Sequence, residues 1–170
     1  MRPLLTLACC VALLVGATAA RAARPALCHT KAPQQVPANG WAAAQSQLAP
    51  PGASAIRLCR YSGLNDHPRL RVVRATLLTR QVWVQKLIRE FDDLPAPPPG
   101  PTACPADLGT EIVAQIAYPD GHAVTISVEM TGCVTVTNGS VTRTAAGFGS
   151  PPQFGPKLVL ELEHLTGYRP

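Results

Sequence analysis

Four cysteines restrict this chain more than any other feature of its sequence: Cys28, Cys59, Cys104 and Cys133. An even number of cysteines in an exported chain is typical of a disulfide framework, and four cysteines allow two bonds in three pairings. A zinc site is the alternative interpretation. Zinc ligands usually come in close C-x-x-C pairs, whereas these cysteines lie about thirty residues or more apart. The sequence therefore predicts two disulfides, and neither a metal nor another cofactor.

The first 22 residues are typical of a secretory signal peptide. Arg2 is followed by an uncharged, mostly apolar run from Leu4 to Gly16, and small residues offer cleavage sites between Ala19 and Ala22. The apolar run is too short to cross a bilayer core of about 30 Å. Two further cysteines, Cys9 and Cys10, would be removed with it. We therefore expect a secreted protein, extracellular or at the cell surface, without a membrane span in its mature form.

The charge of the mature chain does not indicate a nucleic-acid partner. Without the first 22 residues the chain keeps thirteen Lys or Arg against ten Asp or Glu, a net charge of +3. Nucleic-acid-binding surfaces usually cluster basic residues and interleave aromatic ones. Here the basic residues are scattered, apart from one group of arginines on the expected strands: Arg57, Arg60, Arg69, Arg71 and Arg74. Solvated strand edges explain this group.

Turn signals and alternating apolar residues predict an antiparallel sheet. Strands are expected over residues 54–61 and 70–79, and Pro119-Asp120-Gly121 predicts a hairpin between residues 111–118 and one long strand over 124–137. A second tight turn, of type I′, is expected at Asn138-Gly139. Asn138-Gly139-Ser140 also matches a glycosylation sequon, but the turn already explains these residues.

The hairpin register also predicts which cysteines pair. Placing Tyr118 opposite His122 puts Cys104 opposite residue 136, close to Cys133. A disulfide needs Cα atoms within about 7 Å, and this register nearly provides that distance. We therefore expect the bonds Cys104–Cys133 and, by elimination, Cys28–Cys59.

Two helices are expected beside the sheet. Thr79 is a suitable N-cap, and Val84, Leu87, Ile88 and Phe91 form one apolar stripe before Pro95 ends the helix. A second, short helix is expected within residues 157–167, with Leu158, Leu162 and Leu165 on one side and Gly167 as its stop. The proline-rich run over residues 95–105 is interpreted as a rigid loop, held by the first helix and by Cys104.

These elements predict a single α+β domain with one antiparallel sheet packed against two helices, in the order β-β-α-β-β-β-α. Its expected organisation is a signal peptide over residues 1–22, an irregular Pro/Ala-rich arm over 23–53, and the disulfide-stapled domain over 54–168.

No group of residues in the sequence forms a recognisable catalytic or metal-binding motif. Asp92 and Asp93 are adjacent on a helix and point about 100° apart. Asp120 and His122 flank a turn glycine without a third ligand, and Glu161 and His164 lack a second histidine at metalloprotease spacing. A cell-wall hydrolase would need the fold to gather distant acids and histidines, for example Asp66, His67, Asp120 and His122.

Several short motifs nevertheless resemble a recurrent pattern. The series "LCRYSGLN", "LIREFDDLP", "CPADLG", "YPDG", "GC" and "TNG" is similar to one found in an uncharacterised family of small exported or membrane-anchored proteins of high-GC Gram-positive bacteria. It covers roughly residues 54–166. Its motif residues are Cys, Gly, Pro, Asp and Asn at turns, so the resemblance implies a fold and no activity.

The sequence favours an exported, non-enzymatic module that has a binding or structural role at or beyond the cell surface. An envelope or extracellular protein is the expected partner. The first alternative is a secreted protease inhibitor that presents the rigid loop over residues 95–103 to a protease. The second alternative is the cell-wall hydrolase described above.

Overall fold

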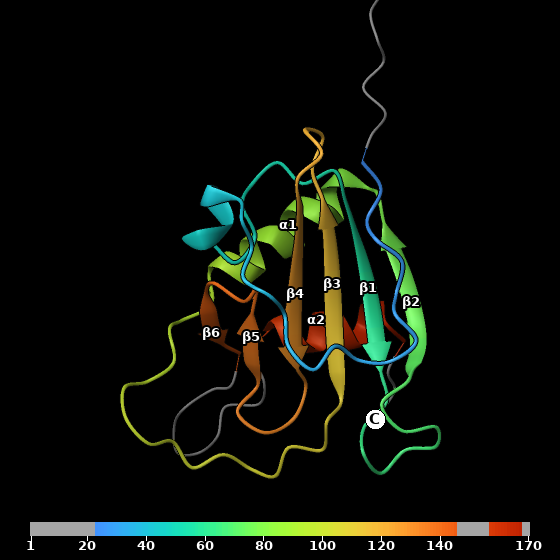
Figure 1. Cartoon of the computed structure of the whole chain (residues 1–170), viewed down its shortest axis with the longest axis vertical. Helices are drawn as coiled ribbons and strands as arrows, with labels where there is room; N and C mark the ends of the chain where they lie inside the picture. Colours follow the sequence, from blue (N-terminus) through green and yellow to red (C-terminus); the bar gives the residue numbers. More distant parts are fainter. Residues whose placement is uncertain (1–22, 146–156, 168–170) are drawn as a thin grey trace, which may run out of the picture.

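The computed structural model describes residues 23–145 and 157–167, so the expected signal peptide and residues 146–156 and 168–170 lie outside it. Its elements confirm the α+β fold (Figure 1). In chain order they are a 3₁₀-helix η1 (Ala42–Gln45), β1 (Ala55–Tyr61), β2 (Val72–Leu78), α1 (Gln81–Asp92), β3 (Glu111–Ala117), β4 (Ala123–Glu129), β5 (Thr135–Thr137), β6 (Thr142–Thr144) and α2 (Lys157–Leu165). The strands form one antiparallel sheet in the order β2-β1-β3-β4-β5-β6.

One face of the sheet carries the hydrophobic core. Period-two alternation places the apolar residues of β1, β3 and β4 on this face, where α1 and α2 cover them (Figure 1). The helix stripe is as expected, because Val84, Leu87, Ile88 and Phe91 are all buried. Leu158 and Leu162 of α2 join the same core. The second helix lies within the expected segment and ends before Gly167, which has a φ of +69°.

The expected long strand over residues 124–137 is wrong, because it is two strands. β4 ends at Glu129, the chain turns over residues 130–134, and β5 pairs back onto β4 with Val128 opposite Val136. Gly132 and Val134 have φ angles of +73° and +48°, which interrupt extended backbone. Met130 and Val134 still pack against the core, so the apolar alternation seen in the sequence continues through residues that form a turn. The order is therefore β-β-α-β-β-β-β-α, one strand more than predicted.

The ends of three other elements differ from expectation. Helix α1 begins at Gln81 with Arg80 as its N-cap, not Thr79, and no side chain caps it. β2 begins at Val72 because Leu70, the expected first residue, has a φ of +48°. The second hairpin turn is not type I′, since Gly139 has positive φ (+84°) whereas Asn138 does not.

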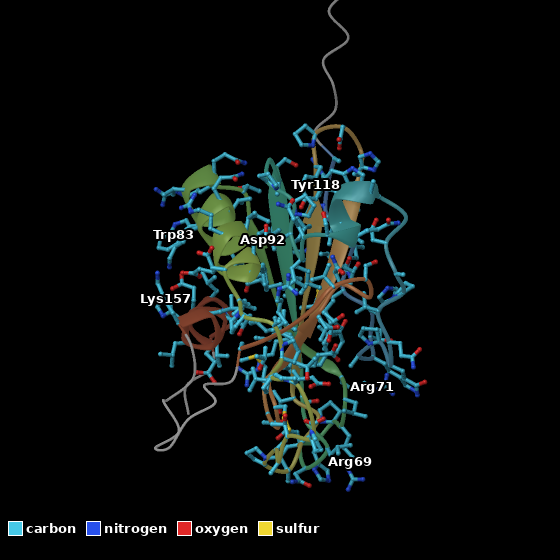
Figure 2. The ribbon with its side chains drawn as sticks, turned by 90° about the vertical axis from the view of Figure 1, so that its left-hand side faces the viewer. Arg69, Arg71, Trp83, Asp92, Tyr118 and Lys157 are labelled. Carbon is cyan, nitrogen blue, oxygen red and sulfur yellow. A yellow bond between two sulfur atoms is a disulfide. The ribbon has the colours of Figure 1, made fainter. Side chains whose placement is uncertain are left out.

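The other face of the sheet is crossed by residues 23–53. Figure 2 shows the helices on one side of the sheet and this arm on the other. The arm pairs with the start of β2, where the Val72 N–H donates to the Thr30 carbonyl (3.2 Å) and the Ala32 N–H to that of Leu70 (3.4 Å). It then crosses the sheet, forms η1, and enters the core through Leu48 and neighbouring alanines. We call the sheet face beneath the arm the open face.

Both predicted disulfides are present, with Cα–Cα distances of 5.6 Å for Cys28–Cys59 and 5.0 Å for Cys104–Cys133. Cys28–Cys59 joins the arm to β1 on the open face. The register argument for Cys104–Cys133 is only partly right. β3 begins at Glu111, so the two cysteines meet through loops and not along an extended hairpin.

Candidate binding site on the open face

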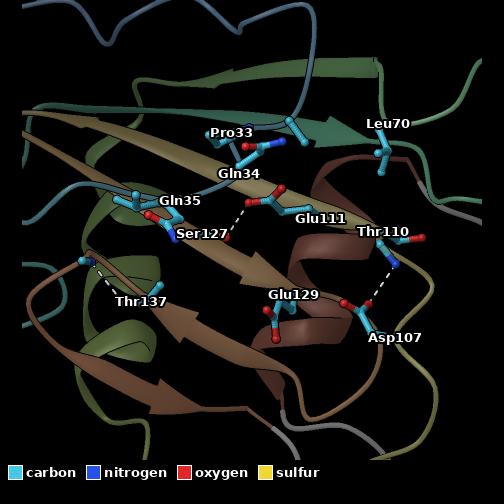
Figure 3. A pocket seen from close by; sticks show the side chains of 14 residues that line it. Pro33, Gln34, Gln35, Leu70, Asp107, Thr110, Glu111, Ser127, Glu129 and Thr137 are labelled. Atoms are coloured by element: carbon cyan, nitrogen blue, oxygen red, sulfur yellow. Dashed lines mark hydrogen bonds between the residues drawn. The ribbon is translucent and has the colours of Figure 1, made fainter.

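A cavity of about 440 Å³ lies between the arm and the open face, where β3 begins and β4 ends (Figure 3). The arm forms one wall, and the loop before β3 forms another. Eight of the lining residues have polar side chains: Gln34, Gln35, Asp107, Thr110, Glu111, Ser127, Glu129 and Thr137. Ala32, Pro33, Val36 and Leu70 supply its apolar part.

Three carboxylates face this cavity. Glu111 and Glu129 are direct cross-strand partners in the β3–β4 ladder, and Asp107 approaches from the loop. The Ser127 hydroxyl donates a hydrogen bond to Glu111 Oε1 (Figure 3). Burial raises the pKa of the Glu111 carboxyl, the Ser127 hydrogen bond opposes that rise, and the nearby charges of Glu129 and Asp107 add to it. The cavity therefore concentrates negative charge around a carboxyl that resists ionisation.

The loop holds Asp107 by two hydrogen bonds. The Gly109 N–H donates to Asp107 Oδ1 (2.8 Å), and the Thr131 hydroxyl donates to the same oxygen (2.7 Å). Thr131 also accepts from the Leu108 N–H (2.9 Å). Thr131 lies in the turn between β4 and β5, next to Cys133. The Cys104–Cys133 disulfide therefore helps to fix the position of Asp107.

The arm is fixed on both sides of the cavity. Before it, Cys28–Cys59 joins the arm to β1, and the Tyr61 hydroxyl donates to the His29 carbonyl (3.1 Å). After it, Asn39 Nδ2 donates to the Ala123 carbonyl (2.8 Å). The arm backbone passes so close to Gly139 that a Cβ there would clash with the carbonyls of residues 36 and 37. The arm, which forms one wall of the cavity, is therefore fixed on both sides of it.

The four residues considered for a hydrolase are not brought together. Asp66 and His67 lie in the loop after β1, and Asp120 and His122 lie in the β3–β4 turn at the opposite end of the sheet (Figure 1). Six residue steps of β1 separate the two ends, about 20 Å at ~3.4 Å per residue.

Each half of that set has a local role. Asp66 Oδ2 accepts from the Gly63 N–H (2.6 Å), and Asp120 Oδ1 accepts from the His122 N–H (3.1 Å). The His122 ring stacks on Trp41 with centroids 4.6 Å apart. These contacts fix two turns.

The helical candidates also lie apart from the cavity. Asp92 accepts from the Ala49 N–H (3.1 Å), and burial raises the pKa of its carboxyl. Asp93 is exposed. On α2, Glu161 forms an ion pair with Lys86 of α1 (2.7 Å), while His164 is exposed.

The sequence pointed to none of the cavity carboxylates. The register that pairs Tyr118 with His122 also pairs Glu111 with Glu129, and the structure confirms it. Like charges at directly opposed positions of a sheet are destabilising. The opposed pair Glu111 and Glu129 could therefore have indicated from the sequence that these carboxylates have a role other than stability. Asp107 gave no such signal, because its position depends on the loop path and the disulfide.

Among the described residues, no three His, Cys, Asp or Glu side chains are placed to hold a metal ion. Within the same residues, no helix has the length and apolar character needed to cross a membrane. Comparison of the chain with protein-family models, curated proteins and solved structures found no match.

Proposed function

We propose that this chain is an exported, non-enzymatic binding module, and that its open-face cavity receives a cationic group of a partner at or beyond the cell surface. The observation that carries the proposal is the convergence of three carboxylates in a cavity of about 440 Å³. The Gln34 and Gln35 side chains beside them can orient a ligand by hydrogen bonds. The volume suits one or two amino-acid side chains.

Electrostatics favours a cation over other ligands. Glu111 is partly buried beside Glu129 and Asp107, so its ionised form is destabilised. An ammonium or guanidinium group among these carboxylates would favour ionisation and form charge-assisted hydrogen bonds. Binding should therefore release protons at pH values near the raised Glu111 pKa.

Calorimetry of the mature protein would test this proposal. The probes are a short peptide containing lysine and arginine, and the same peptide with norleucine and citrulline in their places. We expect the basic peptide to bind with proton release, and Glu129→Gln to weaken it about tenfold. Asp93→Asn, which removes one carboxylate outside the cavity, is the matched control. Equal binding of both peptides, or equal losses in both variants, would refute the proposal.

A second candidate function, protease inhibition, is favoured by the proline-rich loop. Residues 95–108 are exposed except Pro98, and the loop is held at both ends. The Pro95 carbonyl accepts from the Thr144 N–H (3.0 Å), and Cys104 is bonded to Cys133. A panel of serine and metalloproteases assayed with the protein would test this candidate. An absence of inhibition at micromolar protein would exclude it for the enzymes assayed.

A further inference from the structure

A second cavity, of about 510 Å³, lies at the other end of the open face and has the opposite charge. It is formed by the start of the arm, the start of β1 and the end of β2. The described residues that line it are Ala23, Arg24, Pro25, Ser54, Ala55, Arg57, Leu77 and Thr79. Two of them are arginines, and none is acidic.

Arg57 occupies an unusual position for an arginine. It projects onto the open face from β1, next to the edge strand β2, between its cross-strand partners Leu77 and Gln115. The residue is half-buried, and its Nε is buried without a hydrogen-bond partner. Within the described part of the chain, no carboxylate forms an ion pair with it. Buried guanidinium N–H groups normally have partners, so this orphaned donor calls for an acceptor.

The polar neighbours of Arg57 are bonded elsewhere. The Gln115 side-chain oxygen accepts from the Thr125 hydroxyl (2.9 Å), and the Ser54 hydroxyl donates to the Ala117 carbonyl (3.0 Å). Arg24 and Thr79 are exposed and add further donors to the cavity. Leu77, Ala55 and Pro25 supply apolar walls, which strengthen charged contacts by excluding water.

We propose that this cavity binds an oxyanion, a carboxylate or a phosphate group, between the guanidinium groups of Arg57 and Arg24. Guanidinium presents N–H donors in a planar fork that matches two oxygens of either group. The site lies about 14 Å from the acidic cavity, four residue steps along the strands from Glu111, and does not depend on a cation binding there. An oxygen of the bound oxyanion would accept the hydrogen bond that the buried Arg57 Nε–H lacks in this structure.

The test follows the Arg57 Nε–H resonance by NMR in the mature protein. Inorganic phosphate and acetate are added in separate titrations, with chloride at matched ionic strength as the control salt. We expect a saturable shift of this resonance with at least one oxyanion and none with chloride. The difference between the phosphate and acetate titrations identifies the preferred group. A linear shift that is equal for all three salts would overturn the proposal.

Three substitutions make the test specific. Arg24→Gln should weaken oxyanion binding about tenfold, whereas Arg89→Gln, which removes an exposed arginine on α1, should leave it unchanged.

Arg57→Met should match or exceed the wild-type melting temperature in chloride, because it removes the orphaned donor. It should also lose the rise in melting temperature that the oxyanion gives the wild type. An equal rise in Arg57→Met and wild type would overturn the proposal.

Discussion

At the scale of single residues, Glu111 is a carboxyl placed where ionisation is unfavourable. Its pKa is raised in the folded state, so it binds its proton more tightly there than in the unfolded chain, where the ordinary value is 4.5. Its contribution to stability is therefore full below about pH 4.5 and is lost as the pH rises through the folded-state pKa. Glu111→Gln keeps an acceptor for Ser127 and removes the charge.

We predict that Glu111→Gln raises the free energy of unfolding at neutral pH. The gain should shrink as the pH falls through the folded-state pKa and disappear below 4.5. Urea unfolding across this pH range measures it. Glu163→Gln on α2 is the matched control. A gain that does not change with pH would mean that the folded state does not raise the pKa of Glu111.

Asn138 joins the last hairpin to the arm through an almost fully buried amide. Its Nδ2 donates to the carbonyls of Ala44 (2.8 Å), Gln47 (2.9 Å) and Leu48 (3.2 Å). Its Oδ1 accepts from the N–H groups of residues 140 and 141. The side chain is thus part of the interior, although the sequence indicated only a turn.

We predict that Asn138→Ala lowers the free energy of unfolding by about 2 to 4 kcal/mol, because it leaves buried carbonyl and N–H groups unpaired. Asn138→Asp should cost more, since it keeps the acceptor and turns an anionic oxygen toward three carbonyls. Chemical denaturation measures both. The exposed Asn65→Ala is the control. Equal stability of the Ala and Asp variants would contradict the assigned contacts.

At the scale of elements, the two disulfides close loops of similar length with different local effects. Their sequence separations are 31 and 29 residues, so chain entropy predicts about 3 to 4 kcal/mol for each. Cys28–Cys59 holds the arm over the open face, while Cys104–Cys133 holds the loop that carries Asp107.

We predict that Cys28→Ala with Cys59→Ala increases hydrogen exchange at the Ala32 and Val72 N–H groups, which join the arm to β2. Cys104→Ala with Cys133→Ala should instead increase exchange at the Leu108 and Gly109 N–H groups. Both variants should lose similar free energy of unfolding. Uniform loss of protection in either variant would show that the arm and the loop are not independently held.

The sequence predicted elements well where local periodicity and burial agreed. The α1 stripe, the position of α2 and the β3–β4 register are as expected, and so are both cysteine pairs. The division of residues 124–137 was missed because Met130 and Val134 keep their alternation by packing on the core outside any strand. The role of the arm was missed because its burial depends on distant partners such as Asn138, which local patterns do not reveal. The cavity residues were missed for the same reason.

At the scale of the whole molecule, the two sheet faces have separate roles. The helix face carries the core, so the open face is free to display polar and charged groups under the arm. Carboxylates gather at one end of this face and arginines at the other, although residues 23–170 carry a net charge of only +3. Cys28–Cys59 and the arm lie between the two cavities. The fold therefore carries two cavities of opposite charge on one surface.

The arm that walls both cavities depends on the Cys28–Cys59 disulfide, which requires an oxidising compartment outside the cytosol. Protein purified from the producing cell's medium or envelope should therefore begin within a few residues of Ala22 and lack Cys9 and Cys10. Its four cysteines should resist alkylation until reduced, and then add four labels by intact mass spectrometry. A product that keeps residues 1–22, or that alkylates without reduction, would contradict export through a signal peptide into an oxidising compartment.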